Sequence, residues 1–173
     1  RTAEPFSYYA QHRETPQKIL IVENKDTFFS MRRHLLAGAS SLLGEAVGSL
    51  IYGAGKRVVS SFREFSVSAE PYMKEEANEL LYFGDLDYEG IGIYENLAEA
   101  LAAPWTVRPF LAAYRAMLEK AAGIALPQTK EKQNWHITGG FFAHFAAADV
   151  LAMQQILEAG RYIPQEILHL EDF

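Results

Sequence analysis

The sequence predicts an α/β fold: a central parallel sheet of about four strands, helices on both faces, and a mostly helical C-terminal extension. Short apolar runs alternate with stretches of helical periodicity, which is typical of parallel strands joined by helical crossovers. These runs are almost continuously apolar, as in strands covered on both faces. With 173 residues, 49% hydrophobic and 22% charged, the chain has the size and composition of one globular domain.

The first third of the chain predicts the opening of a βαβ unit. The segment KILIV at residues 18–22 predicts the first strand, and Asp26 is a suitable N-cap for a helix that reaches about Leu36. Residues 49–52 predict a second strand that ends at a glycine-containing turn. A helix is expected to follow from Val58 to Phe65.

The middle of the chain predicts two further strand–helix pairs. Residues 80–83 form the third strand candidate, followed by a helix over 91–101 that ends before Pro104. Residues 106–108 are a short fourth strand candidate before a helix at about 111–121. The sheet and its helices therefore account for most of the chain up to residue 122.

The last third of the chain has a different character. Residues 123–134 are a polar connector, 141–159 predict a long apolar helix, and Pro164 is expected in the first turn of a closing helix. We therefore expect a catalytic core at 18–122, a helical extension at 123–173 that packs on it, and a lead-in at 1–17 from an upstream region.

Charge and cysteine content exclude several classes of protein. The 16 basic and 22 acidic residues give a net charge of −6, which argues against binding nucleic acid by bulk attraction alone. Carboxylates that bind divalent cations could still approach phosphates. The absence of cysteine excludes a disulfide scaffold and a thiol nucleophile. The lack of cysteine is also compatible with a cytoplasmic protein, which is the expected location. No apolar run approaches the roughly 18 residues of a membrane span, so no membrane partner is expected.

Three carboxylates are predicted at the carboxyl ends of strands. Asp85 and Asp87 follow the third strand, and in extended backbone two residues at this spacing point to the same side. Glu23 takes the equivalent place after the first strand, and the three carboxylates converge if the first and third strands are neighbours. Open α/β sheets bind ligands at this edge, and clustered carboxylates need a cation such as Mg²⁺ to neutralise them. The three residues together predict a metal site, although each one alone would more simply be a helix cap or a solvated loop residue.

Several nearby residues leave two interpretations open. The segment GAGKR at 53–57 could hold a phosphate with its backbone N–H groups and with Lys56 and Arg57, or it could be a glycine turn with solvated basic residues. Lys25 could contact phosphate or counter the charge of Glu23, and a solvated lysine explains it equally well. Glu166 could belong to the site or be a first-turn carboxylate favoured by the helix dipole.

The segments IVENKDTFFSMRRHL, YGAGKRVVSSF and YFGDLDYEGIGIYENL together resemble the Toprim domain, the metal-binding catalytic domain of type IA and II topoisomerases, primases and several nucleases. A glutamate after the first strand and a D-x-D pair after a later one are its signature. The resemblance is closest to the C-terminal domain of JetD, the nuclease subunit of the bacterial Wadjet anti-plasmid system, which is related to the topoisomerase VI A subunit. It covers roughly residues 18–168, including the closing RYIPQEIL. Tyr88 departs from the topoisomerase pattern, in which proline is usual.

The resemblance implies a Rossmann-like Toprim fold and a DNA endonuclease that depends on Mg²⁺ or Mn²⁺. Asp85 and Asp87 would hold the metal, and Glu23 would join them or act as general acid or base. The winged-helix region with the topoisomerase tyrosine has no counterpart here, so water is the expected nucleophile. The implied partners are double-stranded DNA, an SMC-like ATPase and the other Wadjet subunits, with a homodimer as a further candidate.

Two other functions remain open on the residues alone. A non-catalytic Toprim-like scaffold would bind DNA or partner subunits without cutting. A haloacid-dehalogenase-type phosphatase would use Asp85 as nucleophile and Asp87 as acid, but it usually places this motif on its first strand and has threonine or valine where Glu89 stands.

Overall fold

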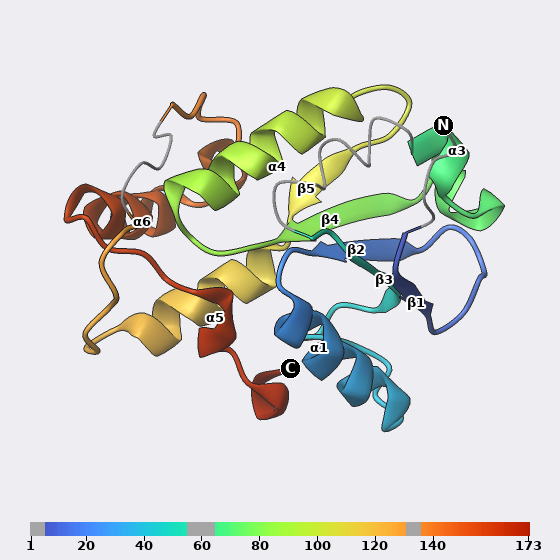
Figure 1. Ribbon diagram of the computed structural model, residues 1–173, viewed down its shortest axis with the longest axis horizontal. Helices are drawn as coiled ribbons and strands as arrows, with labels where there is room; N and C mark the ends of the chain where they lie inside the picture. Colours follow the sequence, from blue (N-terminus) through green and yellow to red (C-terminus); the bar gives the residue numbers. More distant parts are fainter. Residues whose placement is uncertain (1–5, 55–64, 131–135) are drawn as a thin grey trace.

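The structure of the chain is a computed structural model that describes residues 6–54, 65–130 and 136–173 (Figure 1). It confirms the predicted α/β fold. The strands are β1 (Tyr8–Ala10), β2 (Lys18–Val22), β3 (Val47–Tyr52), β4 (Glu79–Phe83) and β5 (Val107–Pro109). They form one sheet in the order β1-β3-β2-β4-β5, in which β3, β2, β4 and β5 are parallel and β1 runs antiparallel to β3.

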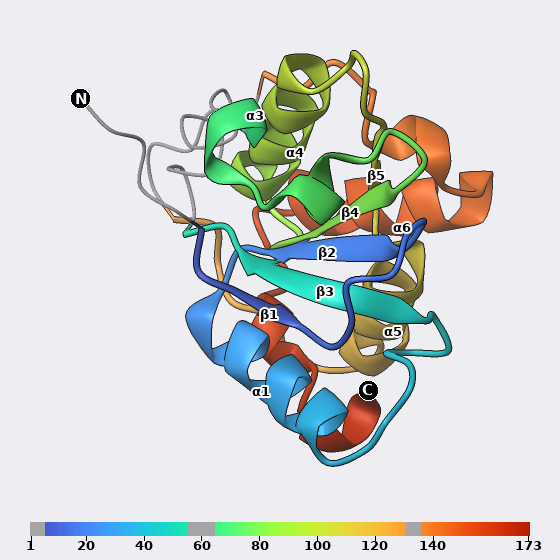
Figure 2. The same ribbon diagram turned by 90° about the vertical axis from the view of Figure 1, so that its right-hand side faces the viewer.

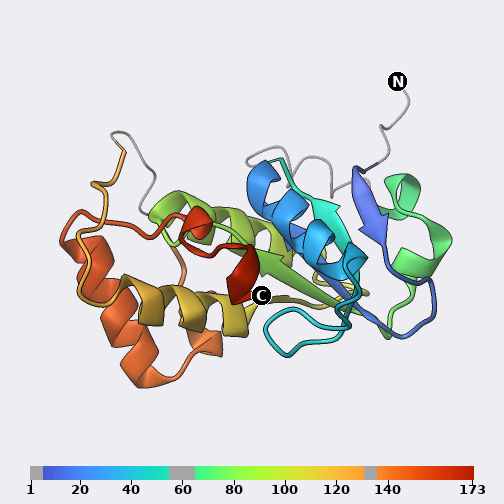
Figure 3. The ribbon, with the colours of Figure 1, turned by 90° about the horizontal axis from the view of Figure 1, so that it is seen from below.

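Helices cover both faces of the sheet. The α-helices are α1 (Lys25–Leu36), α3 (Phe65–Ser68), α4 (Tyr88–Ala100), α5 (Leu111–Ala121) and α6 (Ala147–Glu158). The short 3₁₀ helices are η1 (Pro71–Lys74), η2 (Phe142–His144), η3 (Gln165–Ile167) and η4 (Leu170–Asp172). Figure 2 shows α1 and α5 on one face and α3 and α4 on the other. Seen from below, η3 and η4 lie between α1 and α5 (Figure 3). Among the helices of the described ranges, none is long and apolar enough to cross a membrane.

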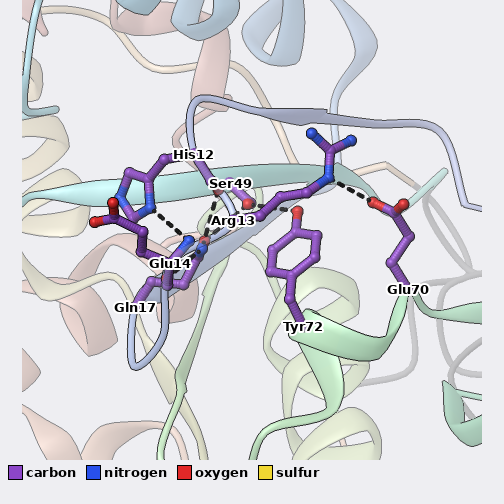
Figure 4. Close-up of polar contacts among 7 residues, drawn as sticks. All are labelled: His12, Arg13, Glu14, Gln17, Ser49, Glu70 and Tyr72. Atoms are coloured by element: carbon purple, nitrogen blue, oxygen red, sulfur yellow. Dashed lines mark hydrogen bonds and ion pairs between the residues drawn. The ribbon is translucent and has the colours of Figure 1, made fainter.

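Strand β1 was not predicted. It has three half-buried residues, so it lacks the apolar run that identifies the interior strands. The chain that follows it is tied to the sheet by buried polar contacts (Figure 4). The Ser49 hydroxyl donates to Gln17 Oε1 at 2.8 Å and lies 2.7 Å from the Tyr72 hydroxyl, while Gln17 Nε2 donates to the carbonyls of His12 and Glu14. Strand β1, which lies in the predicted lead-in, therefore belongs to the sheet, and residues 11–17 connect it to β2.

Two predicted helix starts differ from the structure. The N-cap of α1 is Asn24 rather than Asp26: its side chain accepts from Thr27 N at 2.9 Å, and Asp26 lies in the first turn. Helix α4 begins at Tyr88, three residues before the predicted start, because Asp87 caps it. The predicted helix from 58 to 65 falls largely outside the described residues.

The long helix predicted at 141–159 is interrupted. Phe141 is fully buried and Phe145 nearly so, and both rings lie against Tyr114, at centroid distances of 5.0 and 5.8 Å. The extended backbone of Phe145 and Ala146 separates η2 from α6, so a short turn and a helix replace one long helix. The closing helix predicted at Pro164 is the single turn η3.

The chain order of the strands creates a switch point between β2 and β4. The β2–α1–β3 unit extends to one side of this point and β4–α4–β5 to the other. Right-handed crossovers then put α1 and α4 on opposite faces, as Figure 2 shows. Ligand sites of open α/β sheets lie outside the carboxyl ends of strands at such a point.

Candidate active site

Glu23 lies directly after β2, at the switch point. Its backbone N–H donates to the carbonyl of Phe83 at 3.0 Å, so the ends of β2 and β4 are side by side. Its Oε2 accepts a 2.8 Å hydrogen bond from the hydroxyl of Tyr82, which is fully buried. The carboxylate lies over Gly84, where an added Cβ would come within 2.2 Å of Oε2. Gly84 therefore gives the Glu23 side chain the space that it occupies.

Asp85 lies two residues after β4 and is held by the C-terminal extension. Its Oδ1 accepts from Gln165 N at 2.8 Å and from Gln165 Nε2 at 3.4 Å. Gln165 is 1% exposed, and its Oε1 accepts from Asn24 N at 3.2 Å. One buried glutamine thus joins the turn after β2 to the turn after β4. Paired backbone hydrogen bonds between Leu86 and Ile163, 2.8 and 3.1 Å long, hold the extension beside this turn.

Asp87 is the N-cap of α4. Its Oδ1 accepts from Gly90 N at 2.6 Å, and the side chain is 6% exposed. Its backbone is extended, and Leu86 between the two aspartates is fully buried in the core. The position of the Asp87 carboxylate is therefore set by its role as the cap of α4.

Burial and nearby negative charge raise the pKa of Glu23 and of Asp85. Desolvation raises the pKa of Glu23 to about 7, and the charges of Asp85, Asp87 and Glu89 add to this rise, while the hydrogen bond from Tyr82 opposes it. The pKa of Asp85 is also raised by burial, against the hydrogen bonds from Gln165. The three predicted carboxylates are thus close enough for their charges to interact.

Glu166 extends the acidic cluster. Burial raises its pKa, and the nearby charge of Asp85 raises it further, while Lys130 lowers the pKa of both groups. Sequence reasoning did not find Gln165, Tyr82, Glu89 or Lys130. Glu89 was visible as an acidic residue next to the D-x-D pair. No local pattern marks Gln165, because its contact with Asp85 spans 80 residues.

The donor chemistry fits a hard divalent cation, but the described side chains are not arranged around one. Carboxylate oxygens are the ligands that Mg²⁺ and Mn²⁺ prefer, and burial disfavours the ionised forms of Glu23 and Asp85 in the metal-free fold. Over the described ranges, no group of three or more histidine, aspartate or glutamate side chains is arranged to hold a metal ion. Glu23, Asp85 and Asp87 each accept a hydrogen bond from a protein donor instead.

The predicted phosphate contacts are placed only in part. Lys25 is the first residue of α1 and is exposed, with its Nζ 5.9 Å from the centroid of the Phe29 ring. Lys56 and Arg57 lie outside the described residues. The turn that leads to them begins beside the site, since Gly53 N donates to the carbonyl of Val22 at 2.8 Å.

Glu23→Gln is expected to stabilise the metal-free fold at pH 8 and to change it little at pH 5. The unfolded chain loses the Glu23 proton near pH 4.5, whereas the folded chain keeps it to about pH 7, so wild-type stability falls between these values as pH rises. Glutamine mimics the protonated side chain, and we expect a gain of about 2 kcal/mol at pH 8. Urea unfolding in EDTA at both pH values measures it. Glu158→Gln, exposed on α6, is the control. Equal effects of Glu23→Gln at the two pH values would contradict the prediction.

Gln165→Ala is expected to destabilise the chain by about 1–3 kcal/mol, because it removes a buried side chain and leaves the partly buried Asn24 N–H without its acceptor. Gln154→Ala, at an exposed position of α6, is the control and should change stability by less than about 0.5 kcal/mol. Urea unfolding of both variants measures the difference. Equal stabilities would show that the Gln165 side chain does not join the two turns.

One family comparison gives a match. The family model described as Wadjet protein JetD, C-terminal matches residues 1–166, which include Glu23, Asp85, Asp87 and Gln165. No curated protein and no solved structure matches the chain.

Proposed function

The chain belongs to the Wadjet protein JetD, C-terminal family, and we propose that it is the Toprim-type, divalent-metal-dependent DNA endonuclease domain of a Wadjet-like anti-plasmid defence system. The observation that carries the proposal is the carboxylate cluster at the switch point of the sheet. Glu23, Asp85 and Asp87 lie at the carboxyl ends of the two strands where this class of sheet binds ligands. The strand order and the opposite placement of α1 and α4 are compatible with a Toprim domain.

Asp85 and Asp87 would hold Mg²⁺ or Mn²⁺, with Glu23 as a third ligand or as the general acid or base. A cation bound there stabilises charge on the phosphate and lowers the pKa of water. Glu23 has a pKa of about 7, so near neutral pH it can take up or release a proton. Tyr82 orients the Glu23 carboxylate with its hydroxyl, and Gln165 orients Asp85. The overall reaction would be hydrolysis of a phosphodiester bond by water.

As a component of the Wadjet system, the chain belongs to a multi-subunit assembly. We propose double-stranded DNA as the substrate and the SMC-like ATPase with its associated subunits as partners, in the cytoplasm. A homodimer is a further candidate that would bring two sites to one duplex.

A second candidate is a non-catalytic scaffold with the same fold. It is favoured by the observation that each carboxylate of the cluster already has a protein donor, Asp87 as a helix cap. Such a scaffold would bind DNA or partner subunits and leave the phosphodiester bonds intact.

Incubation of the chain with supercoiled plasmid in Mn²⁺ tests the proposal. We expect nicked and linear products with Mn²⁺ and none with EDTA. Binding of the plasmid without cleavage would support the scaffold. Hydrolysis of p-nitrophenyl phosphate without plasmid cleavage would support the phosphatase instead.

A further inference from the structure

Helix α1 carries basic side chains that are not compensated by carboxylates. The ion pairs of the described residues lie elsewhere and join carboxylates to Arg13, Lys18, Arg108, Arg115 and Lys120. Lys25, Arg32 and Arg33 all belong to α1, and none of them forms an ion pair or a side-chain hydrogen bond with another described residue. The whole chain has a net charge of −6, so α1 is a local region of positive charge on an acidic protein.

These side chains share the outward face of α1. Thr27, Phe28, Met31 and Leu35 are buried against the sheet. Lys25, Phe29, Arg32 and Arg33 follow the i, i+4, i+7, i+8 spacing of a single helix face. Lys25, Phe29 and Arg33 are exposed and Arg32 is half-buried, so this face of α1 is turned to solvent. Figure 2 shows α1 on the outside of the sheet. We call these four residues the α1 face.

Phe29 lies at the centre of the α1 face. Its side chain is 39% exposed, and the guanidinium of Arg32 lies 4.6 Å from its ring centroid, which orders the arginine without neutralising it. A surface hollow of about 580 Å³ adjoins these residues, and Asp26 is the one carboxylate among the residues that line it. The α1 face therefore has an arginine held in place by Phe29, a positive charge, and a surface hollow beside it.

The α1 face begins at the carboxylate cluster. Lys25 lies two residues after Glu23, and Arg32 lies about 10 Å farther along the helix at 1.5 Å per residue. Along one strand of duplex DNA, this length corresponds to about three base-pair steps of 3.4 Å. Positive groups at both ends of the helix can therefore contact different phosphates of one strand.

We propose that the α1 face binds the phosphate backbone of duplex DNA and holds it beside the carboxylate cluster. The inference rests on the proposed function for its choice of partner. The carboxylates themselves repel DNA, so attraction has to come from a neighbouring surface, and the α1 face supplies it. Arginine binds phosphate through a planar fork of donors, and Arg32 and Arg33 present two such groups in adjacent positions.

The double variant Arg32→Gln/Arg33→Gln tests the inference, since glutamine removes the charges and keeps a high helix propensity. Binding to a fluorescent 30-base-pair duplex is measured by anisotropy in EDTA, where no cleavage occurs, over a series of salt concentrations. We expect at least a tenfold weaker Kd at 0.1 M salt and a slope of log K against log [salt] reduced by about two. Arg32→Lys/Arg33→Lys should restore the slope.

The matched control is Arg115→Gln/Arg161→Gln, which removes the same charge from exposed positions on α5 and in the extension. It should keep the wild-type slope. Equal loss in both double variants would show a general charge effect and overturn the inference. Wild-type DNA affinity in the α1 variant, or no DNA binding by the wild-type chain, would also overturn the inference. Binding of polyglutamate to the α1 face that leaves the DNA affinity unchanged would do the same, because it would show that DNA binds elsewhere.

Cleavage by the wild-type chain separates this inference from the proposed function. A chain that binds DNA through the α1 face but never cuts would refute the nuclease and leave the binding surface in place. A nuclease whose DNA affinity is unaffected by both arginine substitutions would refute the surface alone.

Discussion

Asp85→Asn is expected to lower Mn²⁺-dependent plasmid cleavage at least about 100-fold, because loss of residues that only orient metal ligands already costs about 10–100-fold. The same change should leave the metal-free melting temperature unchanged or raised. Burial raises the pKa of the Asp85 carboxyl, so its ionised form is unfavourable in the metal-free fold, and a neutral amide removes that cost. The amide oxygen of asparagine can still accept from Gln165 N.

Plasmid cleavage in Mn²⁺ and the melting temperature in EDTA are measured together for wild type, Asp85→Asn and a control. The control is Asp149→Asn on α6, a surface carboxylate paired with Arg115, which should cut normally. At Asp87, asparagine is again the informative substitution, because it removes the charge and can still cap α4. Alanine there would remove the cap on Gly90 N, at about 1 kcal/mol.

Lower cleavage together with an unchanged or higher melting temperature distinguishes a metal ligand from a residue that only stabilises the turn. An Asp85→Asn variant that cuts normally would refute the ligand role. One that melts much earlier and fails to cut would show that the aspartate mainly supports the turn.

Gly90→Ala is expected to destabilise the fold by about 3 kcal/mol, whereas Gly92→Ala in the same helix should stabilise it by up to about 1 kcal/mol. A Cβ at Gly90 would lie 2.3 Å from the backbone oxygen of Asp85 and 3.0 Å from Asp87 Oδ1, so the turn that carries both aspartates would have to move. A Cβ at Gly92 meets no atom within 4 Å. Both changes remove one glycine from α4, so propensity alone predicts the same sign for both.

Urea unfolding of the two alanine variants measures these changes, and cleavage assays on the same samples show whether the turn has moved. Destabilisation of similar size at both glycines would contradict the close approach of α4 to Asp85. Retained cleavage in Gly90→Ala would show that the site tolerates the displacement.

The interior strands could be predicted because their burial is visible in the sequence. In β2, residues 19–22 are fully buried, and a strand covered on both faces needs apolar side chains at every position. Helix α5 was predicted with the correct ends, 111 and 121. Strand β1 could not be found, because three half-buried edge residues leave no pattern. The start of α4 was predicted too late, since Asp87 caps a turn whose glycine at position 90 weakens the helical signal.

The positions of the carboxylates at the ends of strands could be predicted from the sequence, whereas their hydrogen-bond partners could not. Parallel strands end at a common edge, so Glu23 and Asp85 were expected near each other if the first and third predicted strands are neighbours, and the pairing of β2 with β4 meets this condition. The hydrogen bonds from Tyr82 and Gln165 depend on tertiary packing between segments up to 141 residues apart in sequence, for which single-sequence periodicity carries no signal. Arg32 and Arg33 were visible as charges on a predicted helix, but only the fold shows the surface hollow that they line with Phe29.

The contact between Gln165 and Asp85 also has a consequence for the order of events during synthesis. Ribosomes add about 5–20 residues per second, so the 80 residues that separate the two positions take about 4–16 s to make. Late in that interval, once β5 has been made, a nascent chain contains the whole sheet together with Glu23, Asp85 and Asp87, but neither Gln165 nor Glu166. Completion of the site is therefore a late step of folding. A ribosome-bound intermediate that lacks the extension would contain Asp85 without its hydrogen bonds from Gln165.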